Sequence, residues 1–92
     1  MLKTTRYDTA AILKTKKDVV AYLNAVFEED DPALISHALG VVARAEGMAE
    51  IAKQAGLTRP SLYKALSEDG SPEFATVLKV IRALGFKLKV AA

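Results

Sequence analysis

The stretch "EIAKQAGLTRPSLYKAL", residues 50–66, constrains the fold of this chain more than any other. Its apolar residues recur where two short helices would pack on each other and on a third; they are Ile51, Ala55, Leu57, Leu62, Ala65 and Leu66. Gly56 stands where the chain must leave the first helix sharply, in a left-handed conformation that glycine adopts without penalty. Ala52 is small where a larger side chain could hold the helices apart. The pattern predicts a helix-turn-helix, with an ordinary helical hairpin as the alternative.

Periodicity and capping residues predict three further helices. Thr15 is a candidate cap for the first of them, and Asp31 followed by Pro32 is a strong start for the second. Ser71 and Pro72 repeat that start for the last helix, in which Phe74, Val77, Leu78, Ile81 and Leu84 are expected to be buried. The expected helices cover residues 16–29, 32–46, 48–55, 59–67 and 72–84.

A short strand is expected after the last helix, because "FKLKV", residues 86–90, alternates apolar and basic side chains. A single strand leaves its hydrogen-bonding edges open, so it needs a partner such as the same strand of a second subunit. Phe86, Leu88 and Val90 are therefore the candidate dimer contacts. The predicted fold is an all-α, five-helix domain with a short C-terminal β-strand.

Composition narrows the classes of function. Ninety-two residues, 51% of them hydrophobic, fit one compact globular domain. The absence of cysteine excludes disulfides and thiolate metal sites, and it fits a cytoplasmic protein. His37 is the only histidine, expected at the surface, and no carboxylates are spaced as ligands, so no metal or cofactor is expected. The apolar runs are too short to span a bilayer, and the N-terminus does not resemble a signal peptide.

The second helix of the central stretch carries the candidate binding residues. Leu62, Ala65 and Leu66 cluster on its inner side. The residues on its outer side and at its N-terminal end are Thr58, Arg59, Pro60, Ser61, Tyr63, Lys64 and Ser67. In a DNA-recognition helix such residues meet the major groove, where an arginine can bond a guanine bidentately and a lysine suits a phosphate. A solvated polar face is the alternative.

The charge distribution favours nucleic acid only weakly. The net charge is +2, and residues 48–67 carry Lys53, Arg59 and Lys64 against Glu50 alone. The exact start of the second helix stays open, because a residue that precedes a proline is disfavoured in helical geometry. Thr58 is then one candidate cap and Arg59, with Pro60 as first helical residue, the other. Either start leaves amide N–H groups free for a phosphate.

An enzyme is not expected. Ser61 and Lys64 have the S-x-x-K spacing of penicillin-recognising enzymes, but the companion elements are missing and the chain is too short to wall a pocket around them. No catalytic triad or glycine-rich phosphate loop is present either. There is accordingly no candidate catalytic residue and no small-molecule substrate.

From "YDTAAIL" through "ALGFKL" the chain resembles the addiction-module antidote proteins, HigA-like antitoxins with a lambda-repressor-like helix-turn-helix of the Cro/C1 type. The most specific part is "GLTRPSLYKALSEDGSPEFATVLKVIRALG", residues 56–85. The family commonly has an acidic residue at the position of Pro60 and asparagine at that of Ser71, which puts the start of the recognition helix and the operator sequence in doubt. The resemblance implies two activities: neutralising a RelE/ParE-like (HigB-like) toxin, and binding palindromic operator DNA as a homodimer to repress the shared operon.

The resemblance also suggests a division of labour. Residues 1–30, an N-terminal arm and the first helix, are the candidate toxin-contacting segment, with Tyr7, Ile12 and Leu13 as anchors. Residues 31–92 carry the DNA-binding unit and the dimerisation strand. Two other functions stay open: a stand-alone, phage-type repressor without a toxin, and a protein-interaction module that has lost DNA binding.

Overall fold

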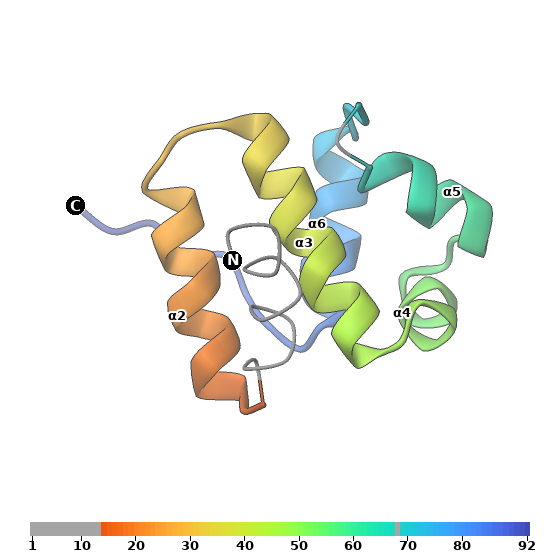
Figure 1. The fold of residues 1–92 in the computed structure, drawn as a ribbon, viewed down its shortest axis with the longest axis horizontal. Coiled ribbons are helices and arrows are strands. Elements are labelled where there is room, and N and C mark those ends of the chain that lie inside the picture. Colours follow the sequence, from red (N-terminus) through yellow and green to blue (C-terminus); the bar gives the residue numbers. More distant parts are fainter. Residues whose placement is uncertain (1–13, 68) are drawn as a thin grey trace, which may run out of the picture.

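The computed structural model describes residues 14–67 and 69–92, and most of these residues are helical (Figure 1). The helices are α2 (Lys16–Phe27), α3 (Pro32–Glu46), α4 (Met48–Ala55), α5 (Arg59–Ala65) and α6 (Phe74–Ala83). Each of these helices overlaps one that was expected from the sequence, and together they agree with the predicted all-α fold. None of the helices in the described ranges is both long enough and apolar enough to cross a membrane.

Two helix starts follow directly from local sequence. At α2, the Thr15 hydroxyl accepts from the Asp18 N–H at 3.1 Å, and the Asp18 carboxylate accepts from the Thr15 N–H at 3.1 Å. This reciprocal pair is a capping box. At α3, the Asp31 carboxylate accepts from the N–H groups of Ala33 and Leu34, and Pro32 opens the helix. Both predicted starts are confirmed.

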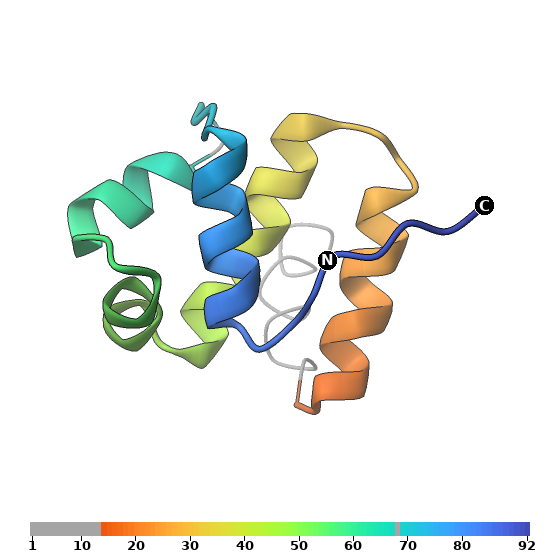
Figure 2. The same cartoon turned by 180° about the vertical axis from the view of Figure 1, so that it is seen from behind.

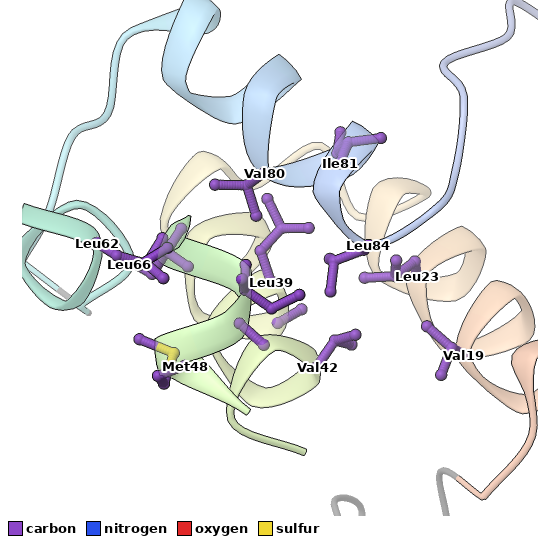
Figure 3. Close-up of a cluster of buried hydrophobic side chains, with 14 of the residues drawn as sticks. Val19, Leu23, Leu39, Val42, Met48, Leu62, Leu66, Val80, Ile81 and Leu84 are labelled. Carbon is purple, nitrogen blue, oxygen red and sulfur yellow. The ribbon is translucent and has the colours of Figure 1, made fainter. Parts of the chain in front are cut away.

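One core joins all five helices, with α3 at its centre (Figure 3). Helix α3 packs against α2 and α4, and α4 packs in turn against α5 and α6. The largest side chains that are fully buried are Leu39, Leu62, Leu66, Val42 and Val80. Tyr22 packs at the edge of this core, and burial raises the pKa of its phenol above the ordinary value of 10.0.

Helix α6 corrects two expectations. It begins at Phe74 with Glu73 as the N-cap, so Ser71 and Pro72 precede the helix and do not start it. The intervening chain is used to fold back onto α5, as described below. Phe74 was expected in the core but is 68% exposed, because it lies in the first turn of α6, beyond the cover of the neighbouring helices. Val80, not anticipated as a core residue, is fully buried instead.

The strand expected over residues 86–90 is not confirmed: the described part of this single chain contains no β-strand. Gly85, with φ of 90°, ends the turn after α6, and the chain then runs across α2 (Figure 2). A strand needs a partner to complete its ladder. Pairing of these residues with another chain therefore stays a prediction.

Replacing Leu39 tests the central position of α3. Leu39→Ala should lower the free energy of unfolding by about 2–5 kcal/mol, because it opens a cavity at a fully buried position in the core. Urea denaturation followed by circular dichroism measures the change. Val20→Ala, at a position that is 41% exposed on α2, is the control and should cost far less. Equal losses for the two variants would contradict this account of the core.

Candidate nucleic-acid interface

Helices α4 and α5 are joined by a three-residue turn, Gly56 to Thr58. Gly56 caps α4 in the left-handed conformation, with φ of 74° and ψ of 30°, which confirms the expectation from sequence. The N–H of Leu57 donates to the carbonyl of Ala52 at 2.8 Å, and the N–H of Gly56 donates to that of Lys53 at 3.2 Å. The turn thereby satisfies the last carbonyls of α4 as it redirects the chain.

The two helices cross steeply. In Figure 1, α4 is seen almost end-on while α5 lies across the view, and the reverse view in Figure 2 agrees. In an ordinary helical hairpin the two axes run antiparallel, and the crossing seen here differs from that. The crossing lets α5 place one side against the core and hold the other away from the body of the molecule.

The inner side of α5 is defined by Leu62 and Leu66, which are 0% and 1% exposed. They join the core cluster together with Met48 and Ile51 of α4 (Figure 3). Six of the seven candidate DNA-binding residues are exposed on the rest of the helix and at its start: Thr58, Arg59, Pro60, Ser61, Tyr63 and Lys64. The structure therefore brings these six side chains to one solvent-facing surface, called the α5 surface below.

The start of α5 is settled by a hydrogen bond. The Thr58 hydroxyl accepts from the Ser61 N–H at 3.1 Å, which makes Thr58 the N-cap. Arg59 and Pro60 are then the first two helical residues, so Arg59 is not the cap. The conformational bias against a helical residue before proline is overcome here by the cap and by the packing of Leu62 behind it.

This cap changes what the α5 surface can offer a ligand. The Thr58 hydroxyl also donates to the Ser61 hydroxyl at 2.8 Å, so both of its hydrogen-bonding roles are used internally. The Ser61 hydroxyl keeps its own proton for an outside acceptor. Pro60 has no N–H and the Ser61 N–H is capped, so the free amides expected at this end reduce to those of Thr58 and Arg59. The groups left to donate outward are the side chains of Arg59, Ser61, Tyr63 and Lys64.

Ser67 does not share this surface. It is half-buried, its hydroxyl donates to the Lys64 carbonyl at 2.9 Å, and its carbonyl accepts from the Gly70 N–H at 2.9 Å. Its role is to close the C-terminal end of α5. Gly70 was not singled out from the sequence, although it lies in the turn "EDGSP". A Cβ atom on Gly70 would lie 2.5 Å from the carbonyl oxygens of Lys64 and Ala65, so only glycine lets the loop approach α5 this closely.

The chemistry of the α5 surface is that of a hydrogen-bond donor face carrying two permanent cations, Arg59 and Lys64. A guanidinium can bond two acceptors in one plane, and an ammonium can bond an anionic oxygen. Hydroxyls of Ser61 and Tyr63 add neutral donors between them. Within residues 14–67 and 69–92 no cluster of metal-ligating side chains is found.

The other candidate residues lie elsewhere. Tyr7, Ile12 and Leu13 fall outside the described residues. Phe86 is half-buried against the core, with the Lys16 ammonium 5.5 Å from its ring centroid. The other two candidate dimer contacts, Leu88 and Val90, are 43% and 100% exposed. Their contact with a second subunit stays a prediction.

Comparison with known proteins places this geometry in context. A family model described as "Probable addiction module antidote protein" matches residues 3–92, nearly the whole chain. A protein of Haemophilus influenzae (strain ATCC 51907 / DSM 11121 / KW20 / Rd), described as "Uncharacterized protein", is 46% identical over 84 residues. That alignment covers 91% of this chain and 87% of the relative. No solved structure matches the chain significantly.

The cap of α5 can be tested by stability. Thr58→Ala removes the acceptor for the Ser61 N–H and should lower the free energy of unfolding by about 0.5–2 kcal/mol. Thr58→Ser keeps a hydroxyl at the same position and should therefore retain most of the parent protein's free energy of unfolding. Thermal unfolding of the two variants beside the parent protein measures the difference. A serine variant as unstable as the alanine variant would show that the hydroxyl is not what stabilises the helix start.

Proposed function

The chain belongs to the family of probable addiction module antidote proteins, and we propose that it is the HigA-like antitoxin of a type II toxin–antitoxin module. An antidote implies a toxin partner in general. The proposal specifies that partner as a RelE/ParE-like (HigB-like) toxin and adds a second activity, dimeric binding of operator DNA that represses the module's own operon. The protein acts by binding and not as an enzyme.

The observation that carries the DNA-binding part is the α5 surface. A three-residue turn holds α5 steeply across α4, and its exposed side presents Arg59, Ser61, Tyr63 and Lys64. These features support a helix-turn-helix, in which the second helix enters the major groove with its N-terminal residues toward the bases. In a dimer, two such helices would meet successive major grooves about 34 Å apart.

The side chains divide by position along α5. Arg59 opens the helix and suits a guanine, whose O6 and N7 accept a bidentate pair of hydrogen bonds. Lys64, one turn further on, suits a phosphate. Ser61 and Tyr63 can donate to a base or to the backbone, while Pro60 contributes shape alone because it lacks an N–H. Thr58 positions the helix, and its hydroxyl proton is donated within the helix, so it can meet DNA only as an acceptor or through its N–H or its methyl group.

The toxin-binding part rests on the family. The segment proposed to contact the toxin is the N-terminal one, residues 1–30, with Tyr7, Ile12 and Leu13 as anchors. It precedes the DNA-binding unit, and α2 within it lies on the far side of α3 from α5 (Figure 1). A toxin held there would leave the α5 surface open.

Two substitutions test the roles on DNA. Arg59→Ala should cost about 1–3 kcal/mol on the operator and relax its sequence preference, whereas Lys64→Ala should weaken operator and random DNA alike. Lys64→Ala should also reduce the slope of log affinity against log salt by about 1. Fluorescence anisotropy with promoter DNA and scrambled DNA at several salt concentrations measures both effects. An equal loss for Arg59→Ala on the two DNAs would refute its role as the base reader.

Co-expression tests the antitoxin role. The product of the adjacent reading frame should arrest growth alone and should be neutralised by this chain, with which it should co-purify. Deletion of residues 1–14 should then abolish rescue while leaving operator binding intact. Full rescue by the truncated protein would remove the arm from the toxin contact. Growth unaffected by any neighbouring product would favour a stand-alone repressor.

A further inference from the structure

Residues 86–90, which are called the tail below, run across α2 (Figure 2). A groove lies between α2 and the tail. Its volume is about 420 Å³, and six apolar side chains line most of it: Val20, Leu23, Phe27, Ile81, Phe86 and Leu88. Leu23 and Ile81 also belong to the core, so the floor of the groove is fixed by the fold. Nothing in the function of the α5 surface uses this groove.

The backbone of the tail beyond Phe86 pairs with no other backbone group among the described residues. The N–H of Phe86 donates to the Ile81 carbonyl at 3.1 Å, which anchors the start of the tail. Residues 87–90 have no regular structure and no backbone hydrogen bond to another described residue. A free stretch of N–H and C=O groups alongside apolar side chains is a template for an added β-strand.

Exposed hydrophobic side chains occur on α2 and on the tail. Val20 on α2 is 41% exposed, Leu88 is 43% exposed and Val90 is 100% exposed. These three account for most of the five large hydrophobic side chains that are exposed in the described chain; Tyr63 and Phe74 lie on α5 and α6. An added strand would bury apolar side chains against this cluster at the same time as it paired with the tail.

The positive charge of the groove favours a partner that carries negative charge. Its charged lining residues are two cations, Lys87 and Lys89, and its remaining polar side chain is Asn24. The Lys16 ammonium, over the Phe86 ring, adds a third cation at the start of the tail. Because the described residues that line the groove include no carboxylate, an acidic segment would be attracted and a basic one repelled.

A second copy of the tail fits this charge pattern poorly. In an antiparallel pair centred on Leu88, Lys87 lies directly opposite Lys89 of the second copy, twice. Like charges placed opposite each other destabilise a sheet, and lysines on an exposed edge are a common device against self-pairing. A strand that alternates acidic and apolar side chains instead gives each lysine an opposite charge and each apolar tail residue an apolar neighbour.

We propose that the groove is a docking site for the toxin, which adds an extended segment of alternating acidic and apolar side chains to the tail. This inference rests on the proposed function, and it replaces self-pairing of Phe86, Leu88 and Val90 as the role of the tail. Helix α2, which belongs to the segment proposed to contact the toxin, forms one wall of the groove.

Charge reversal tests the proposal on the full chain. The double variant Lys87→Glu with Lys89→Glu should bind the product of the adjacent reading frame about tenfold or more weakly, as measured by biolayer interferometry. The matched control is Lys53→Glu with Lys79→Glu, which changes the net charge equally at exposed positions outside the groove and should bind the toxin normally. The backbone amides of residues 87–90 should gain protection from hydrogen exchange in the complex. Thermal unfolding of both variants verifies that they fold.

The other outcomes are distinct. Normal toxin binding by the groove variant, with no added protection of residues 87–90, overturns the docking site while leaving the antitoxin function in place. Protection of those amides in the isolated chain, together with a dimer that Leu88→Asp dissociates in sedimentation, shows a second copy on the tail and also overturns it. If the parent chain neither binds that product nor rescues growth, the proposed function and the docking site fall together.

Discussion

The burial of Leu62 and Leu66 is the interaction on which the α5 surface depends. Helix α5 has only seven residues, and isolated helices shorter than about 12–15 residues are marginal in water. It persists because these two leucines are fully buried in the core formed around Leu39 and Val80. The same contact sets the rotation of the helix, since successive residues turn by about 100°. Fixing Leu62 inward therefore turns Tyr63 and its neighbours outward.

Hydrogen bonds at both ends of α5 add to the stabilisation that the buried leucines give the helix. Thr58 caps the first turn, and Pro60 in that turn restricts the backbone further at the loss of one donor. At the other end Ser67 closes on the Lys64 carbonyl, and Gly70 lets the following loop lie against the helix. Polar groups that might otherwise contact a ligand are thus spent on holding the helix. What remains for recognition is a few distal side chains on a rigid support.

The sequence predicted the helices well, because their apolar spacing and their caps at Thr15 and Asp31 are local features. The sequence could not decide whether Thr58 or Arg59 is the N-cap of α5. The two starts differ only in whether the Thr58 hydroxyl accepts from the Ser61 N–H, which the structure shows. The late start of α6 depends on Gly70 packing against α5, which no local pattern expresses. Phe74 shows a further limit: periodicity identifies the inner side of a helix but not where its neighbours end. The groove was missed because its walls come from opposite ends of the described chain.

The proposed DNA and toxin surfaces are both cationic, yet their cations have different settings. Arg59 and Lys64 stand on an exposed helix side among hydroxyl side chains, a setting that suits the polar backbone and base edges of DNA. Lys87 and Lys89 flank an apolar groove and an open backbone edge, a setting that suits a protein strand. Because the net charge is only +2, the total charge of the chain does not favour one partner over the other. The surroundings of each pair of cations distinguish the two proposed partners instead. Helices α2 and α5 lie on opposite sides of α3 (Figure 1), so a toxin bound at α2 and DNA bound at α5 would lie on opposite sides of the same chain. Any coupling between them must then pass through the shared core or through a second subunit on the DNA.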